Sequence, residues 1–300
     1  MDGFIREIQS EIESRENYAA LYDQANFNER AETLDFLETD VIDRIEVLRG
    51  RIGWSPELAG LLQAAEGLRT RLEALDEALF RGLRHEIASG DCTGSALKER
   101  ITSYAGTGKN GASQPGEGYD QLDGLVNGLL LAEPAPEAPA RRDPEMYFYQ
   151  PTPVRVVLEL LDLAGLRQGD VFYDIGSGLG QVSILVHLLS GVQVKAVEIE
   201  PVYCDYARRC AINLNIARVQ FINLDAREVD YSDGTVFYLY TPFVGSMLEQ
   251  VLGKLRRVST KKRIRLYTYG PCTRQVARAK WLQRLDKNVD GNGLATFRGG

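Results

Sequence analysis

Three glycines and a nearby carboxylate mark the stretch of the chain with the clearest chemical character. In DVFYDIGSGLGQVSILV (170–186), Gly176, Gly178 and Gly180 directly follow an apolar run, and Asp174 lies two residues before the first of them. Glycine lets the backbone turn at positive φ and approach a ligand closely. A carboxylate at this point repels a pyrophosphate and attracts a ligand with amine or cationic character. The stretch therefore predicts a loop that binds a cationic nucleotide-like cofactor.

The loop departs from the pattern that binds dinucleotides. That pattern is G-x-G-x-x-G, and its third glycine would fall on Gln181 in this chain. Two further acids follow: Glu198 in AVEIEP, eighteen residues after Gly180, and Asp225 in NLDARE. The missing third glycine and the lack of a clear proton-donor residue make a nicotinamide oxidoreductase the less favoured interpretation.

Alternating strands and helices would bring these motifs together. We predict strands at 171–175, 193–198, 219–223, 235–240 and 264–269, with helices between most of them. This alternation is typical of right-handed crossovers and a mostly parallel, doubly wound sheet. WLQRLDKN and GLATFRGG, around the turn sequence DGNG, predict a closing antiparallel pair. In such a sheet, ligands bind beyond the carboxyl ends of the strands, where the strand order reverses.

The order of these elements resembles the class I S-adenosylmethionine-dependent methyltransferases over about 147–300. The resemblance implies a Rossmann-like α/β domain with a seven-stranded, mostly parallel sheet, and S-adenosylmethionine as cofactor. It implies that Asp174 meets the amino group of the methionine part, Glu198 the ribose and Asp225 the adenine; Glu200 is a rival for the ribose. The cofactor-binding residues it predicts are Tyr149, Thr152, Asp174, Gly176, Ser177, Gly178, Gly180, Gln181, Glu198, Asp225 and Ala226.

The segment MYFYQPTP (146–153) precedes the first strand of the domain by one helix. In methyltransferases this segment often closes over the methionine end of the cofactor. Its aromatic side chains, Tyr149 among them, can face a sulfonium through cation–π attraction. Thr152 and Gln150 offer polar contacts to a carboxylate. The alternative is that the aromatic residues only join two domains.

Residues after the fourth strand bear on the methyl acceptor. Tyr240 and Thr241 begin Y-T-P-F where adenine and glutamine methyltransferases carry [DN]-P-P-[YF], which argues against those acceptors. YDIGSGLGQ with VKAVEIE also resembles the telomeric-silencing-disruptor family of histone lysine methyltransferases, although that family's Asn-rich stretch is replaced by YTPF. We assign Tyr240 and Thr241 to the catalytic site and expect a protein lysine or related amine as acceptor. A small-molecule O- or N-methyltransferase and a non-catalytic binding module are the alternatives.

The first hundred residues predict helices. Ser55 and Pro56 form an N-cap and first helical position, and a leucine-rich stripe follows from Leu58 to Leu79. Such a stripe has to pack against an intramolecular bundle, the second domain, or a second copy in a homodimer. We predict a helical domain at 1–104, a linker with a short helix at 105–145 and the methyltransferase domain at 146–300.

Composition and charge limit the remaining choices. With 300 residues, of which 44% are hydrophobic, the chain can form a sizeable core. The four cysteines form no CxxC pair and there are only two histidines, so we expect neither a disulfide framework nor a metal site. No run suits a membrane helix or a signal peptide, which predicts a cytoplasmic protein. Residues 1–100 carry 21 acids and 12 bases, and residues 254–300 carry 13 bases and 2 acids. Nucleic-acid binding through 254–298 is a less favoured alternative to charge neutralisation within the molecule.

Overall fold

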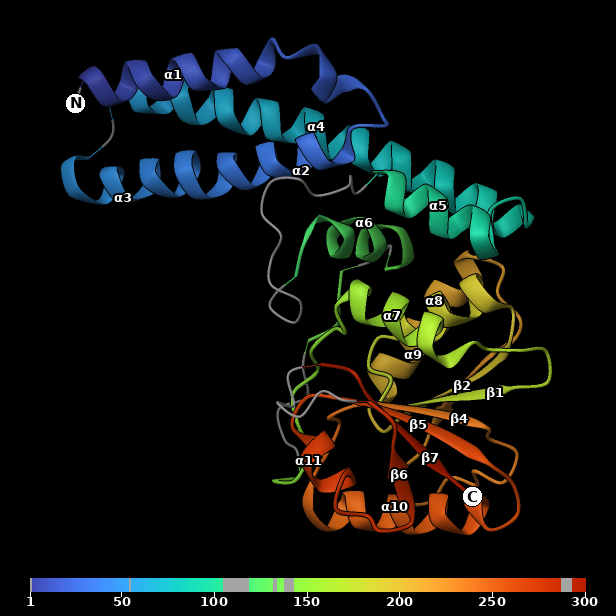
Figure 1. Ribbon diagram of the computed structural model, residues 1–300. Helices are drawn as coiled ribbons and strands as arrows, with labels where there is room; N and C mark the ends of the chain where they lie inside the picture. Colours follow the sequence, from blue (N-terminus) through green and yellow to red (C-terminus); the bar gives the residue numbers. More distant parts are fainter. Residues whose placement is uncertain (1, 54, 105–118, 132–133, 138–142, 287–292) are drawn as a thin grey trace.

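A seven-stranded sheet with helices on both faces forms the C-terminal half of the molecule (Figure 1). The computed structural model describes residues 2–53, 55–104, 119–131, 134–137, 143–286 and 293–300. The strands are β1 (Val171–Ile175), β2 (Gln193–Glu198), β3 (Val219–Asn223), β4 (Val236–Tyr240), β5 (Ile264–Tyr269), β6 (Leu282–Arg284) and β7 (Ala295–Gly299). The predicted α/β, Rossmann-like class is confirmed. The antiparallel pair at the end is β6 and β7, and residues 290–292 of its turn sequence lie outside the described residues.

The strand order places a reversal beside β1. The order is β3-β2-β1-β4-β5-β7-β6, and β1 pairs in parallel with both β2 and β4. The chain therefore winds outward in one direction from β1 to β3 and in the other from β4 to β5. Among the strands that the structure describes, β7 runs antiparallel to both of its neighbours, β5 and β6, and the other pairs are parallel. The point of reversal opens a crevice at the carboxyl ends of β1 and β4.

Two apolar clusters cover the two faces of the sheet. One face packs against α7 (Val154–Ala164), α8 (Gln181–Ser190) and α9 (Pro201–Asn213). The other packs against α10 (Gly245–Ser259) and the short α11 (Cys272–Val276). Buried parallel strands such as β1 and β4 are apolar on both sides, which explains their continuous runs of hydrophobic residues. None of the helices among the described residues combines the length and the hydropathy needed to cross a bilayer.

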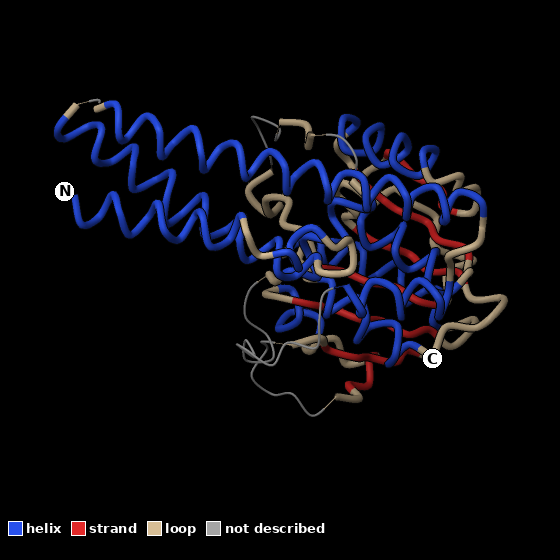
Figure 2. The backbone as a smooth tube through the Cα atoms, turned by 90° about the horizontal axis from the view of Figure 1, so that it is seen from above, coloured by secondary structure: helices blue, strands red, loops and turns tan. Residues whose placement is uncertain are grey.

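The N-terminal helices form an elongated bundle that projects away from the sheet (Figure 2). Its members are α1 (Asp2–Glu16), the short η1 (Ala19–Tyr22), α2 (Phe27–Phe36), the π-helical η2 (Leu37–Ile42), α3 (Asp43–Ile52) and α4 (Pro56–Ser89). The rod from α2 through η2 to α3 lies alongside α1 and α4 (Figure 1). Ile8, Leu37, Ile45 and Leu68 belong to its own apolar cluster. This part of the chain is all-helical, as predicted.

The helix α4 links the bundle to the rest of the molecule. The Ser55 hydroxyl accepts from the Leu58 backbone N–H at 3.3 Å, Pro56 begins the helix, and Gly90 ends it in a left-handed conformation. The helix has 34 residues, which corresponds to about 50 Å. The predicted stripe from Leu58 to Leu79 packs within this one chain: its residues are buried except Leu75, which is partly buried. The N-terminal part of α4 packs in the bundle cluster, and Leu79, Leu83 and Ile87 pack in the cluster that covers one face of the sheet.

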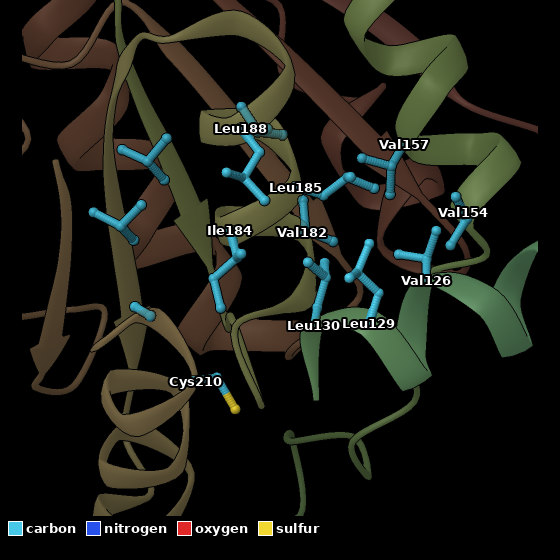
Figure 3. Close-up of a cluster of buried hydrophobic side chains, with 14 of the residues drawn as sticks. Val126, Leu129, Leu130, Val154, Val157, Val182, Ile184, Leu185, Leu188 and Cys210 are labelled. Atoms are coloured by element: carbon cyan, nitrogen blue, oxygen red, sulfur yellow. The ribbon is translucent and has the colours of Figure 1, made fainter. Parts of the chain in front are cut away.

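The helices α5 (Gly94–Tyr104) and α6 (Gln121–Leu130) extend this second cluster toward the sheet. Figure 3 shows Val126, Leu129 and Leu130 of α6 pointing toward α7 and α8. The short helix predicted within 105–145 is α6, and besides lying in the linker it contributes to the apolar cluster on one face of the sheet. We retain 1–104, 105–145 and 146–300 as a proposal for the domain organisation.

A buried ion pair joins α2 to α4 inside the bundle. Arg30 has no exposed surface, and its Nε donates to Asp76 Oδ1 at 2.6 Å. The same guanidinium donates to the backbone carbonyls of Leu21, Asp23 and Gln24. A buried charge of this kind requires such partners, because desolvation costs several kcal/mol per ion. The pair determines how α2 and the turn before it dock on α4.

Candidate functional site

A pocket opens at the carboxyl ends of the parallel strands, at the point where the strand order reverses. It encloses about 1000 Å³ of empty space, part of which is open to solvent. Residues that follow β1, β2, β3 and β4 line it, and the segment 146–152 closes one side. The predicted residues that line it are Tyr149, Thr152, Asp174, Gly176, Ser177, Gly178, Gln181, Glu198, Asp225, Ala226, Tyr240 and Thr241. The structure thus brings all but one of the predicted site residues together.

The loop after β1 contains glycines because neighbouring side chains lie too close to its backbone for a Cβ. Gly176 and Gly178 have φ of +80° and +53°, and a Cβ on Gly178 would lie 2.2 Å from the ring of Tyr149. A side chain there would collide with a pocket wall. Gly180 is the exception among the predicted residues, since it does not line the pocket. A Cβ on it would lie 2.7 Å from that of Ala207, so this glycine serves the packing of the loop on α9.

Asp174 sits at the base of the pocket and is almost completely buried, with 3% of its surface exposed. The Ser183 hydroxyl donates to its Oδ2 at 2.7 Å. Burial raises the pKa of the Asp174 carboxyl to about 7, and the hydrogen bond from Ser183 opposes this rise only in part. A cationic ligand would favour the ionised form. The carboxyl is therefore suited to receive an ammonium group.

Glu198 closes the other side of the glycine loop. Its Oε2 accepts from the Gly178 backbone N–H at 2.8 Å, and its Oε1 accepts from the Glu200 N–H at 2.9 Å. Burial raises the pKa of the Glu198 carboxyl, and these backbone hydrogen bonds counteract that rise. Each oxygen has a second lone pair, so the carboxylate can still accept from hydroxyl groups of a ligand. Glu200 also lines the pocket, which leaves it a rival for the same role.

Asp225 is held by an ion pair within its own loop. The Arg227 guanidinium donates to both carboxylate oxygens of Asp225, at 2.6 to 3.1 Å. The hydrogen bond from the Arg227 side chain is the largest cause that keeps the pKa of Asp225 below its usual value. Asp225 is therefore an ionised acceptor at neutral pH. Ala226 beside it is buried and leaves space at the pocket wall.

The segment before α7 is tied down across the pocket. The Glu145 carboxylate accepts from the Ser246 and Met247 backbone N–H groups at the start of α10, each at 2.8 Å. The Tyr147 N–H donates to the Pro242 carbonyl at 3.0 Å. Further along, the Tyr149 ring packs against Tyr203 with centroids 5.7 Å apart. The segment thus forms a fixed wall, and its Tyr149 ring faces the glycine loop.

Two residues at the end of β4 have different environments. The Tyr240 ring lies 4.8 Å from that of Tyr269, centroid to centroid, and burial raises the pKa of Tyr240 to about 12. Its phenol is therefore neutral and not a base at neutral pH. Thr241 is a non-glycine residue with a φ of +37°, which is a strained conformation. Its hydroxyl donates to the Tyr269 carbonyl at 2.8 Å and accepts from the Cys272 N–H at 3.1 Å.

Two buried polar atoms in the pocket wall lack a partner among the residues that the structure describes. They are the Ser177 hydroxyl oxygen and Gln181 Oε1. Buried polar groups are nearly always hydrogen-bonded in native proteins, so each exception calls for an explanation. Both residues line the pocket beside Asp174. The donor and acceptor set fits the amino-acid part of a cofactor that carries an ammonium and a carboxylate.

Several pocket residues were missed by the sequence reasoning. Tyr238 lies two residues before Tyr240 on β4, so the alternation of a strand could have identified it. Its hydroxyl lies 3.2 Å from that of Thr152. Tyr203 and Met247 come from α9 and α10, and no local pattern distinguishes them from core residues. Only the tertiary structure brings them to the pocket.

The fold and the pocket together define a Rossmann-like enzyme with a site for a nucleoside-containing, cationic cofactor. Comparison with known proteins agrees. The family model "Histone methylation protein DOT1" matches residues 146–239. A protein-lysine N-methyltransferase of Saccharolobus islandicus (strain REY15A) is 30% identical over 118 residues, which are 38% of this chain and 72% of that protein.

Solved structures also match this half of the chain. An RNA methyltransferase from Salinibacter ruber, in complex with S-adenosyl-L-homocysteine, is 28% identical, covers 50% of this chain and 92% of its own, and has a TM-score of 0.39. A precorrin-6y C5,15-methyltransferase from Geobacter metallireducens is 20% identical, with 50% and 89% covered and a TM-score of 0.39.

The chain belongs to the class I S-adenosylmethionine-dependent methyltransferases. It is an enzyme, and its cofactor is S-adenosylmethionine. The oxidoreductase and the non-catalytic binding module are thereby set aside.

Proposed function

We propose that this enzyme methylates the side-chain amine of a protein lysine or a closely related amine. The observation that carries the proposal is the Tyr240 ring, which lines the pocket and packs against the Tyr269 ring with centroids 4.8 Å apart. Aromatic faces attract ammonium and alkylammonium groups. The names of the matching family and of the archaeal relative, a protein-lysine N-methyltransferase, point in the same direction.

The cofactor site that we propose divides the pocket by chemistry. Asp174, Gln181 and Ser177 hold the amino-acid part, Glu198 the ribose and Asp225 the adenine. Bound S-adenosylmethionine supplies an electrophilic methyl group on a cationic sulfur. The chain contributes alignment and the exclusion of water. Tyr149 and Thr152, on the fixed segment before α7, cover the methionine end.

At the acceptor side we propose different roles for the two residues that end β4. Tyr240 contacts the incoming amine through its ring. Thr241 acts as a positioning residue, because its hydroxyl is engaged with the loop after β5 and orients Tyr240. Nucleic-acid binding through the basic residues of 254–298 is a separate prediction and is not part of this proposal.

Radiolabelled S-adenosylmethionine tests the acceptor class. The purified enzyme is incubated with a histone mixture and, separately, with a small-molecule extract. We expect label on protein bands and methyl-lysine after acid hydrolysis, with loss of this signal in Tyr240→Ala and retention of S-adenosylhomocysteine binding. Label confined to the small-molecule fraction would overturn the lysine proposal and favour the small-molecule O- or N-methyltransferase.

A further inference from the structure

A hydrogen bond connects the cofactor pocket to a helix outside the methyltransferase domain. Gln181, the first residue of α8, lines the pocket and is 2% exposed. Its Nε2 donates to Asn127 Oδ1 on α6 at 2.6 Å. Because the amide nitrogen is directed to α6, the amide oxygen is the end that remains for the pocket. That oxygen, Oε1, lacks a protein partner among the described residues.

We infer that Asn127 is a positioning residue for cofactor binding: it orients the Gln181 amide so that Oε1 accepts from the ammonium group of the cofactor's methionine part. This inference rests on the proposed role of Gln181 and extends it to a residue that does not line the pocket. A free glutamine amide can present either its donor or its acceptor end. Only the acceptor end suits an ammonium, and the pairing of Gln181 Nε2 with Asn127 Oδ1 directs that end to the pocket.

The helix α6 is held firmly enough to perform this role. At its start, the Asp123 carboxylate accepts from the Asp120 N–H and from the Val154 N–H at the beginning of α7, at 2.8 and 2.7 Å. At its end, the Arg84 guanidinium of α4 donates to the Gly128 and Leu129 carbonyls. These contacts satisfy helix-end groups that would otherwise lack partners.

Close packing fixes the same helix from the side. A Cβ on Gly128 would lie 2.3 Å from the Phe80 ring, so α6 and α4 approach one another at this glycine. Val126, Leu129 and Leu130 point toward α7 and α8 (Figure 3). Asn127 is thus presented from a helix whose position is determined on several sides.

Calorimetric binding of two ligands tests the inference. S-adenosylhomocysteine carries the amino-acid part, and 5′-methylthioadenosine lacks it. For Asn127→Leu we expect S-adenosylhomocysteine to bind about three- to tenfold more weakly, as expected for the loss of one oriented hydrogen bond, and methylthioadenosine to bind as in the wild type. Asn127→Asp keeps an acceptor oxygen for Gln181 Nε2, so it should retain most of the affinity. Gln181→Ala should reproduce the loss, and adding Asn127→Leu to it should cause no further weakening.

The controls separate positioning from general damage. Gln121→Leu makes a similar change on the same helix, away from the glycine loop, and should alter neither affinity. If Asn127→Leu weakened both ligands equally, or neither, the inference would be overturned. If Gln181→Ala bound S-adenosylhomocysteine normally, both the role of Gln181 and the inference would be wrong. Failure of the wild type to bind that ligand would instead contradict the cofactor site itself.

Discussion

The two ends of the long helix α4 serve different parts of the molecule. At the far end, α1, η2, α3 and the N-terminal part of α4 enclose an apolar cluster of their own. Asp76, paired with Arg30 of α2, lies on α4 between Leu72 of this cluster and Leu79 of the other. At the near end, Leu83 and Ile87 join a cluster that continues through α6 to α8 and the sheet. The same helical periodicity produces both ends. Of the two ends, the near end shares an apolar cluster with α8, which lines the cofactor site, and we propose that this end alone is coupled to the site.

The largest expected effect tests the buried ion pair that lies between the two ends of α4. Asp76→Ala leaves the Arg30 charge buried without its carboxylate, and we expect a loss of about 3–5 kcal/mol in the free energy of unfolding. Chemical denaturation measures this loss. Replacing both residues with apolar ones, as Arg30→Met with Asp76→Leu, should cost less than the single change. If the double variant were less stable than Asp76→Ala, the Arg30–Asp76 pair would contribute more to stability than the avoidance of an unpaired buried charge.

A matched pair of core substitutions compares the two ends directly. Leu68 and Leu83 are both buried on α4, and Leu→Ala at either should cost about 2–5 kcal/mol. Below the unfolding transition, Leu68→Ala should bind S-adenosylhomocysteine normally, whereas Leu83→Ala should bind it more weakly. Calorimetric titration at one temperature measures both. Equal affinities in the two variants would contradict the proposed coupling of the near end to the site.

At the site itself, Asp174→Asn removes the negative charge that we propose for the ammonium. Hydrogen bonds to charged groups contribute about 1.5–3 kcal/mol, so S-adenosylhomocysteine should bind about ten- to hundredfold more weakly. Methylthioadenosine, without the ammonium, should lose much less. The same ligand pair with Glu198→Gln should show similar losses for both, because the ribose is common to them. A uniform loss in Asp174→Asn would contradict the assignment of Asp174.

The smallest effect is a dependence on pH. Burial raises the pKa of the free Asp174 carboxyl to about 7, and binding of an ammonium favours the ionised form. The carboxyl must therefore lose its proton on binding at lower pH, and affinity falls as pH falls below 7. Between pH 8 and pH 6 we expect a decrease of about tenfold for S-adenosylhomocysteine. In Asp174→Asn this dependence should disappear, and its persistence would mean that another group is responsible.

Much of the site followed from local sequence. The apolar run before Gly176 and the acids at the ends of two strands, Asp174 and Glu198, predicted where a ligand binds. Strand ends are local features, and parallel strands bring their carboxyl ends to one edge whatever the details of packing. The G-x-G-x-G spacing also predicts that Gly180 contacts the cofactor. Spacing alone cannot distinguish a glycine required by a ligand from one required by a packed side chain, here Ala207 of α9.

The sequence by itself determined the strands, the helical character of the first hundred residues and the cofactor loop, because periodicity, caps and glycines act over a few residues. Only the tertiary structure decided that the α4 stripe is covered within one chain, that Tyr203 and Met247 enter the pocket, and that Asn127 reaches Gln181. Such contacts depend on how whole helices pack. Residues 54 positions apart in the chain carry no joint signal in a single sequence, although here their side chains lie 2.6 Å apart.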